Sequence, residues 1–201
     1  MNNDPGTMWS ERTESPFRSQ FGEFWLTAYR VGNGEHLALS MGTSDGRAPL
    51  VRVQSACLTG TAFNALLCDC RQQLHLSLQL VAEHGYGAVV YLAQEGRGHG
   101  LVEKVGQLNE MSNGLNTQQA ALARGVEPDV RTYEVAALIL RDLFGYQPLS
   151  VLTNSPTKLE SFAALGIDVL ERVQVEPDPE PGNREYLLVK KTYMGHLLTK
   201  V

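Results

Sequence analysis

Residues 87–100 read GAVVYLAQEGRGHG. Residues 87–92 form an apolar run of the length expected for a buried β-strand. The run leads into a loop with three glycines, and residues 101–108 follow with helical spacing of their apolar side chains. A strand, a glycine loop and a helix in this order are typical of a ligand-binding loop, because glycine lets the backbone approach an anion closely.

The part of the chain before this stretch is rich in strand signals. Apolar runs at 21–31 and 36–41 flank Gly32-Asn33-Gly34, a sequence that favours a tight β-hairpin turn. A further strand is expected at 50–53. Apolar residues then recur at helical intervals from 74 onwards, and this helix is expected to end at Gly85.

The part after the glycine loop predicts alternating helices and strands. Helical spacing occurs at 101–108, 117–123 and 133–144. The next stretch has the order of a βαβ unit: a strand at 149–152, a capped helix start at Thr153-Asn154-Ser155-Pro156, a helix at 158–165 and a strand at 167–173. An acidic, proline-rich loop at 176–182 precedes a last segment at 186–198.

A single compact α/β domain is therefore expected, with a strand-rich N-terminal part followed by alternating helices and strands. The length of 201 residues is enough to bury one core and too short for two large domains. Hydrophobic residues make up 43% and charged residues 19% of the chain, as in ordinary globular proteins. Residues 1–15 are polar and without periodicity, so we expect a flexible tail there and the domain over 16–201.

Charge and hydropathy exclude several classes of partner. The formal net charge is -5, which offers no basic field for nucleic acid, although a small polyanion can still bind a locally basic cleft. No apolar run approaches the roughly 20 residues that cross a bilayer. The N-terminus lacks the basic-then-apolar order of a signal peptide. We expect a cytoplasmic protein without membrane or nucleic-acid partners.

All three cysteines of the chain lie close together, in the pattern Cys57-x10-Cys68-x-Cys70. An odd, clustered set does not resemble a disulfide framework, and thiolates are preferred zinc ligands. Three protein ligands leave a fourth position for water, which is the arrangement of a catalytic zinc. Two alternatives remain open at this point: a closed structural site with His75 as fourth ligand, and three unrelated buried thiols.

Three other places favour an anionic ligand. In the glycine loop, Arg97 adds a cation to free backbone amides, and Lys158 does the same near the helix start at Asn154-Ser155-Pro156. Asp129 and Arg131 form a polar pair just before a helix. Each has an ordinary structural interpretation, as a turn, a capped helix or a surface ion pair. Together with a metal site, they supply what a nucleotide triphosphate requires.

At this point the chain resembles GTP cyclohydrolase II, the enzyme that commits GTP to riboflavin synthesis. The resemblance runs from about Phe17 to Leu198. The stretches that carry it are Arg52 to Gly60, Cys68-Asp69-Cys70, Gln94 to Gly98, Leu152 to Lys158, Glu171-Arg172-Val173 and Met194 to Leu198. Six motifs in the family's order identify the expected fold as GTP cyclohydrolase II-like.

The resemblance implies that Cys57, Cys68 and Cys70 bind a zinc ion that directs water to C8 of guanine, with release of formate and pyrophosphate. It implies a nucleotide site lined by Arg52, Ser55, Gln73, Glu95, Gly96, Arg97, Thr117, Thr153 and Lys158. Asp129 matches the family's proposed general acid/base, and Arg131 its proposed nucleophile or stabiliser at the α-phosphate. A guanidinium stays protonated, which favours charge stabilisation. Mg2+ bound to the triphosphate and a homodimer are also implied.

The chain departs from the family's pattern at five positions. Gln54 and Ala56 stand where the family usually has His and Glu, and Ser155 replaces an Asn. Gly106 replaces a residue that is commonly basic, and Leu108 replaces a tyrosine beside the reacting base. Leucine can neither orient water nor move a proton. Our hypothesis is that the ring opens while formate release is slow or absent, which leaves a formamidopyrimidine nucleotide.

Three functions are compatible with these residues. The first is a GTP cyclohydrolase II-like hydrolase whose product is a diaminopyrimidine or a formamidopyrimidine nucleotide. The second is the same zinc chemistry on a different nucleotide in a secondary-metabolic pathway, which the loss of a carboxylate at Ala56 motivates. The third is a nucleotide-binding regulator with a structural zinc and no turnover.

Overall fold

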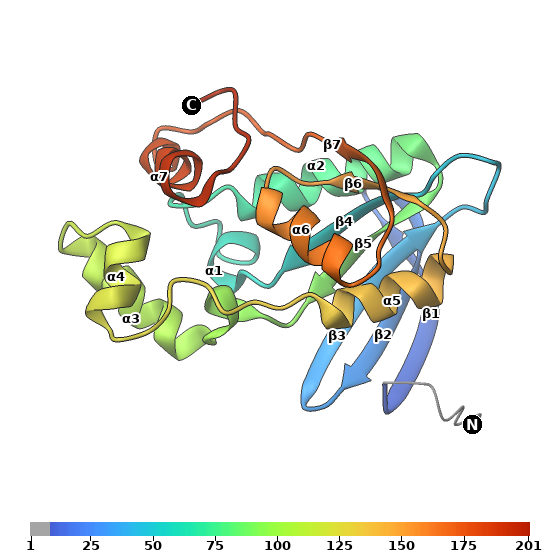
Figure 1. Ribbon diagram of the computed structural model, residues 1–201, viewed down its shortest axis with the longest axis horizontal. Helices are drawn as coiled ribbons and strands as arrows, with labels where there is room; N and C mark the ends of the chain where they lie inside the picture. Colours follow the sequence, from blue (N-terminus) through green and yellow to red (C-terminus); the bar gives the residue numbers. More distant parts are fainter. Residues whose placement is uncertain (1–8) are drawn as a thin grey trace.

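The centre of the protein is one seven-stranded mixed sheet (Figure 1). The computed structural model describes residues 9–201. The strands are β1 (Glu11–Ser19), β2 (Gly22–Val31), β3 (Gly34–Met41), β4 (Leu50–Ser55), β5 (Gly87–Leu92), β6 (Leu149–Leu152) and β7 (Val169–Val173). Their order in the sheet is β1-β2-β3-β5-β4-β6-β7. The neighbours from β1 to β5 pair antiparallel, and β5, β4, β6 and β7 pair parallel.

Helices cover both faces of the sheet and extend from one end of it (Figure 1). The helices are α1 (Leu58–Thr61), α2 (Cys70–His84), the short 3-10 helix η1 (Glu95–Gly98), α3 (Leu101–Ser112), α4 (Thr117–Ala123), α5 (Glu134–Phe144), α6 (Pro156–Ala164) and α7 (Arg184–Met194). In Figure 1, α5 and α6 lie on one side of the sheet and α2 on the other, while α3, α4 and α7 lie beyond its end. Among the described residues, no helix combines the length and the hydropathy that crossing a membrane requires.

The two faces of the sheet carry two separate apolar cores. In β5, Val90 packs in the core that also contains Ile139 and Leu140 of α5, whereas its neighbour Val89 packs with Val81 of α2. Successive side chains of a strand point to opposite faces, so a strand that is covered on both sides is apolar throughout. This explains why residues 87–92 form an uninterrupted apolar run in the sequence.

Most of the expected elements are confirmed, and the α/β class with them. The hairpin turn consists of Gly32 and Asn33, since Val31 pairs with Gly34. The helix expected at 117–123 has these bounds, and the helix before Gly85 ends there in a left-handed cap. The expected βαβ unit is present, with β6 and β7 parallel.

The expected tail over 1–15 is wrong in its last part, because β1 begins at Glu11 and pairs with β2 along its whole length. All eight residues of β1 before Ser19 are exposed, because β1 is an edge strand, so the strand needs no alternating apolar pattern and Glu11 to Ser15 are all polar. Backbone pairing with β2 holds the strand, and ion pairs such as Arg30 with Glu11 and Arg12 with Asp142 flank it. Residues 1–8 of the expected tail lie outside the described residues.

The parallel half of the sheet gathers the motifs at one edge. β4, β5 and β6 are neighbours and run in the same direction, so their carboxyl ends lie side by side. The residues that follow these ends are Cys57, the glycine loop and Thr153. In open α/β sheets ligands bind outside the carboxyl ends of the strands.

The turn after β3 provides a test of the packing. Gly42 has a φ of 75°, and a Cβ atom added to it would lie 1.9 Å from the carbonyl oxygen of Gly85. Gly42→Ala should lower the free energy of unfolding by about 3 kcal/mol, through backbone strain and this clash. The matched control is Gly46→Ala. Gly46 has a φ of 91°, and a Cβ atom added to it would have no atom within 4 Å. This substitution should cost only about 1 kcal/mol. If urea unfolding shows the same loss of free energy of unfolding for both variants, the close contact between Gly42 and Gly85 is contradicted.

Candidate active site

The three cysteines converge at the end of β4. Cys57 precedes α1, while Cys68 and Cys70 lie at the start of α2. Their sulfur atoms all lie within 4.8 Å of one another, and those of Cys57 and Cys68 are 3.8 Å apart. Two sulfur ligands at 2.3 Å from a tetrahedral ion are separated by about 3.8 Å. The cluster can therefore hold a metal ion.

Gly60 leaves space for these sulfur atoms. A Cβ atom at this position would lie 2.8 Å from the sulfur of Cys68 and 3.0 Å from that of Cys57. The residue belongs to α1, the single turn that reverses the chain between two of the three cysteines. Glycine is required here because the sulfur atoms of Cys57 and Cys68 approach the backbone closely, and a larger residue would occupy the space that they need.

Charge within the cluster is concentrated on Cys57. Hydrogen bonds with Cys68 and Cys70 lower its pKa far below the usual range for a thiol, and the ammonium group of Lys104 acts in the same direction. Lys104 Nζ lies 3.1 Å from the sulfur of Cys57 and 2.8 Å from Glu95 Oε1. These two anionic partners raise the pKa of Lys104 although burial opposes the shift. Lys104 thus links α3 to a thiolate and to the glycine loop.

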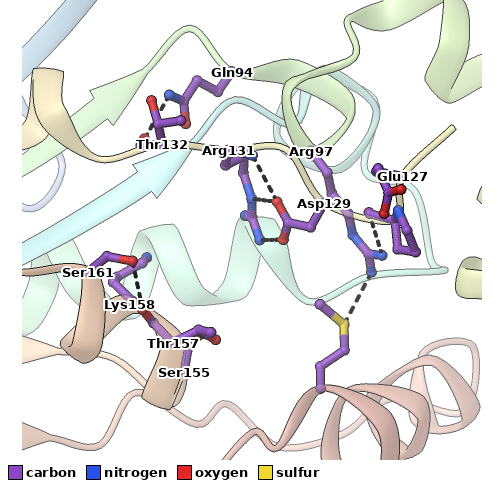
Figure 2. Close-up of polar contacts among 12 residues, drawn as sticks. Gln94, Arg97, Glu127, Asp129, Arg131, Thr132, Ser155, Thr157, Lys158 and Ser161 are labelled. Atoms are coloured by element: carbon purple, nitrogen blue, oxygen red, sulfur yellow. Dashed lines mark hydrogen bonds and ion pairs between the residues drawn. The ribbon is translucent and has the colours of Figure 1, made fainter.

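The glycine loop folds around the carboxylate of Glu95. Its two oxygens accept hydrogen bonds from the backbone N–H groups of Leu58, at 2.6 Å, and Gly96, at 2.9 Å. Gly96 and Arg97 both have a φ of 58°, which is unusual for arginine. The side chain of Arg97, which Figure 2 shows beside Asp129, donates a 3.3 Å hydrogen bond from Nη1 to the carbonyl oxygen of Pro128.

Arg52 is a buried cation with neutral partners. Its guanidinium donates to the side-chain oxygens of Gln54, at 2.7 Å, and Gln73, at 2.6 Å. A third hydrogen bond, of 3.0 Å, goes to the carbonyl oxygen of Leu152. Burial lowers the pKa of Arg52 to about 10. The departure at Gln54 therefore has a structural role, since its amide oxygen holds this arginine.

Lys158 is a second buried cation with a neutral partner. Its ammonium group donates a 2.7 Å hydrogen bond to the carbonyl oxygen of Val53 and lies over the ring of Tyr133. Burial lowers the pKa of Lys158 well below its usual range, and Arg52 and Arg131 add to the effect by repulsion. A bound anion would reverse the electrostatic part of this shift.

Asp129 and Arg131 form a fixed pair just before α5 (Figure 2). Arg131 donates from Nε to Asp129 Oδ1 at 2.9 Å, and its backbone N–H reaches the same oxygen at 3.1 Å. The pair lowers the pKa of Asp129 although burial opposes it, and raises that of Arg131 against the same opposition. Arg131 therefore stays protonated and its fork is held in one orientation.

These groups line one cavity of about 380 Å³. Of the residues expected from the sequence, the cavity brings together Arg52, Ser55, Cys57, Cys68, Cys70, Gln73, Glu95, Gly96, Arg97, Thr117, Arg131, Thr153 and Lys158. Asp129 is not part of the lining and reaches it through Arg131. The hydroxyl of Ser55 is buried and has no hydrogen-bond partner among the described residues.

The positions that depart from the family pattern do not all face the cavity. Gln54, Ala56, Leu108 and Ser155 line it. Gly106 lies against Arg124 instead, because a Cβ atom there would be 2.2 Å from the guanidinium carbon. His75, the alternative fourth ligand, lies outside the thiol cluster and packs its ring 5.2 Å from that of Phe21.

Two helices contribute lining residues that were not expected from the sequence, apart from Leu108, which the family pattern had already placed beside the base. On α3, Lys104, Leu108 and Met111 follow each other at spacings of four and three, and on α7 Tyr186, Lys190 and Met194 are spaced by four. Residues at these intervals share one face of a helix. The spacing was visible in the sequence, but nothing there showed that these faces point into a cavity. Gln107, Tyr133 and His196 were also missed.

Comparisons with known proteins agree with this geometry. A family model described as GTP cyclohydrolase II matches residues 10–174. The "GTP cyclohydrolase-2" of Campylobacter fetus is 42% identical over 182 residues, which are 90% of this chain and 91% of that protein. The "Riboflavin biosynthesis protein RibBA" of Phocaeicola vulgatus is 42% identical over 183 residues, which cover 90% of this chain and 45% of that protein.

The chain thus spans about half the length of several curated relatives, the RibBA proteins, and nearly all of another. Among solved structures, RibBX from A. baumannii, described as a two-domain 3,4-dihydroxy-2-butanone 4-phosphate synthase, is similar at 22% identity with a TM-score of 0.49. That alignment covers 86% of this chain and 42% of the other, and the likeness is too weak to support an argument. Because the family model spans most of the sheet and the cavity, and a relative at 42% identity is covered almost end to end, the chain belongs to the GTP cyclohydrolase II family.

Proposed function

We propose that the protein is a zinc-dependent hydrolase that opens the imidazole ring of GTP at C8 and releases pyrophosphate. The observation that carries this proposal is the content of a single cavity, which holds three converging thiols beside cations that lack acidic partners. None of the ion pairs among residues 9–201 includes Arg52, Arg97 or Lys158. Buried charge without a counter-charge is costly, so an anionic ligand is expected there.

The thiol cluster fits zinc by its chemistry and by its spacing. Three sulfur donors and an open side towards the cavity are the donor set of a catalytic site. When bound, zinc supplies a Lewis acid that activates water at neutral pH. The protein's own contribution is to hold the ligands: Gly60 makes room for them, and Lys104 fixes Cys57 by a charge-assisted contact.

The remaining lining residues would bind the nucleotide. Arg52, Arg97 and Lys158 offer positive charge to the triphosphate, together with the Mg2+ that accompanies such a ligand. The unpartnered hydroxyl of Ser55 is available for a hydrogen bond to the ligand. Gln73, Glu95, Gly96, Thr117 and Thr153 complete the proposed nucleotide site.

Asp129 and Arg131 would act at the α-phosphate. The aspartate holds the arginine fork, and a fixed guanidinium can stabilise the charge that develops as pyrophosphate leaves. The raised pKa of Arg131 favours this role over attack by a neutral guanidine nitrogen. In this proposal Arg131 is an electrostatic group and Asp129 its positioning residue and proton acceptor.

The names of the relatives extend the proposal to a pathway. One relative is named for GTP cyclohydrolase and another for riboflavin biosynthesis. We therefore place the reaction at the start of riboflavin synthesis. A homodimer and a cytoplasmic location stay predictions from the sequence. Turnover of GTP, GDP, GMP and ATP, followed by loss of purine absorbance, tests the substrate. A preference for another nucleotide would favour the secondary-metabolic alternative, and binding without turnover would favour the regulator.

Removal of one thiol should abolish both metal and activity. For Cys68→Ser we expect zinc, measured by atomic absorption, to fall from about one ion per chain to near zero, because a hydroxyl is a far weaker zinc ligand. The matched control is His75→Asn, which changes the exposed histidine outside the cluster and should retain zinc and activity. Zinc loss in the control would favour a closed, structural site.

The contribution of the positive charge of Arg131 can be separated from that of its guanidinium geometry by two substitutions. Arg131→Ala should lower kcat for pyrophosphate release on the order of 10²-fold, because a fixed positive charge at the leaving group is lost. Arg131→Lys keeps the charge without the fork and should retain at least about ten times more activity than the alanine variant. Equal activity in the two variants would contradict electrostatic stabilisation.

Leu108 favours a product that differs from the diaminopyrimidine nucleotide, namely the formamidopyrimidine nucleotide. This side chain lines the cavity together with Phe63 and Met111, so that part of the lining is apolar and Leu108 brings no hydroxyl where the family pattern has one. We propose that the second hydrolysis at C8 is impaired and that the product keeps its formyl group. The wild-type protein should therefore convert GTP without stoichiometric formate.

Leu108→Tyr should restore formate release at unchanged ring opening, because it returns a hydroxyl that can orient water. Mass spectrometry distinguishes the two products, and a coupled formate assay measures the release. Leu108→Phe is the matched control, which adds the ring without the hydroxyl. One formate per GTP from the wild-type protein would contradict the second product and leave the first proposal intact.

A further inference from the structure

The C-terminal segment forms one wall of the cavity. Tyr186, Lys190 and Met194 of α7 line it from one helical face, and His196 follows after the helix ends. Nη2 of Arg97 lies 3.5 Å from the hydroxyl oxygen of Tyr186 and 3.5 Å from the sulfur atom of Met194. Figure 2 draws the contact between Arg97 and this sulfur as a dashed line. The glycine loop and the C-terminal helix therefore meet across the cavity.

Two further contacts hold this segment in place. The backbone N–H of Leu197 donates a 2.8 Å hydrogen bond to the carbonyl oxygen of Asn154, at the start of α6. The carboxylate of Glu176 accepts from the backbone N–H groups of Thr199, at 2.9 Å, and Lys200, at 2.9 Å. The first contact connects the end of the chain to Asn154 in the cavity lining, and the second connects it to the loop after β7. Residues 183–198 lie beyond the part of the chain that the family model matches.

We propose that Lys190 and His196 are substrate-binding residues that contact the phosphate chain of the nucleotide, so that the C-terminal segment completes the triphosphate site. The inference rests on the proposed function and extends it to residues that were not among the expected site residues and lie beyond the part of the chain that the family model matches. The ligand group concerned is a polyphosphate.

Lys190 has hydrogen-bonding capacity left for such a ligand. Its ammonium group has three N–H donors. One reaches Asp69 Oδ1 at 2.8 Å, and among the described residues no second acceptor lies within hydrogen-bond distance. The side chain is 12% exposed, and this remaining surface faces the cavity. Asp69 raises the pKa of Lys190 although burial opposes the shift, so the group stays charged.

His196 lies in a positive environment. Burial lowers its pKa to about 3, and repulsion from Lys190, Lys158 and Arg131 adds to the shift while Asp69 opposes it. The imidazole is therefore neutral near pH 7 and has one N–H donor. Among the described residues its ring has no hydrogen-bond partner in the protein, although it lines the cavity. A phosphate oxygen would satisfy this donor and offset the three surrounding cations.

Inorganic triphosphate is the best probe, because it has the charges of the ligand and no ring to open. Its binding to the zinc-loaded protein can be measured by isothermal titration calorimetry, beside guanosine and the KM for GTP. Lys190→Met should weaken triphosphate binding about tenfold or more, and His196→Leu about fivefold, as expected for a charged and a neutral hydrogen bond. Guanosine binding should change less than about twofold in either variant.

The matched control is Lys191→Met, on the same helix. Lys191 is exposed and contacts the backbone of Val201, so its replacement should leave triphosphate binding within about twofold of the wild type. His196→Leu guards against misfolding of the Lys190 variant, because it removes no side-chain hydrogen bond of the described structure.

The outcomes separate the two proposals. Unchanged triphosphate binding in both variants overturns the inference, even if Lys190→Met loses zinc, since the lysine would then act on the metal ligands through Asp69. Equal weakening of triphosphate and guanosine overturns it as well, because the effect would be a general disturbance of the cavity. A wild-type protein that binds neither triphosphate nor GTP contradicts the proposed function itself.

Discussion

The parallel direction of β4, β5 and β6 is the constraint on which the rest of the structure depends. It places Cys57, Glu95 and Thr153 at one edge of the sheet although about forty to sixty residues separate them in the chain. Apolar cores on both faces fix the strands, so the positions of these residues are set by well-packed elements. The loops that follow the strands then need to turn only once to bring their side chains together.

Gathering cations at this edge has an electrostatic cost, which the protein meets in two ways. Lys104, Arg131 and Lys190 each face a carboxylate that is fixed by further hydrogen bonds. Arg52 and Lys158 instead face carbonyl and amide oxygens, which orient the cations without neutralising them. The first group is stable without a ligand. The second holds unbalanced charge until an anion binds, which favours a polyanionic ligand over a neutral one.

The sequence was informative where one residue type has few alternatives. The glycine loop, the hairpin turn at Gly32-Asn33 and the thiol cluster were predicted from such residues, and Asp129 with Arg131 from the family's motifs. The sequence carried no signal for features whose position depends only on the tertiary structure. The exposed strand β1 gave no periodic signal. Residues 194–198 match a family motif, but no local pattern in 186–198 indicated that α7 returns to a site made from residues 52–158. Long-range packing of this kind is a property of tertiary structure and not of local pattern.

Two of the departures from the family pattern, at Ala56 and Leu108, replace groups that could move protons with apolar side chains. Ala56 directly precedes Cys57, and Leu108 follows one helical turn after Lys104, whose ammonium group contacts the sulfur of Cys57. The cations that would bind the phosphates, such as Lys158, match the family's motifs. Loss of a carboxylate and a hydroxyl removes groups that move protons at the base, while the charge that holds a triphosphate is kept. In the proposed reaction, binding and ring opening would therefore depend on residues that match the family pattern, and the later proton transfers would depend on the positions that have changed.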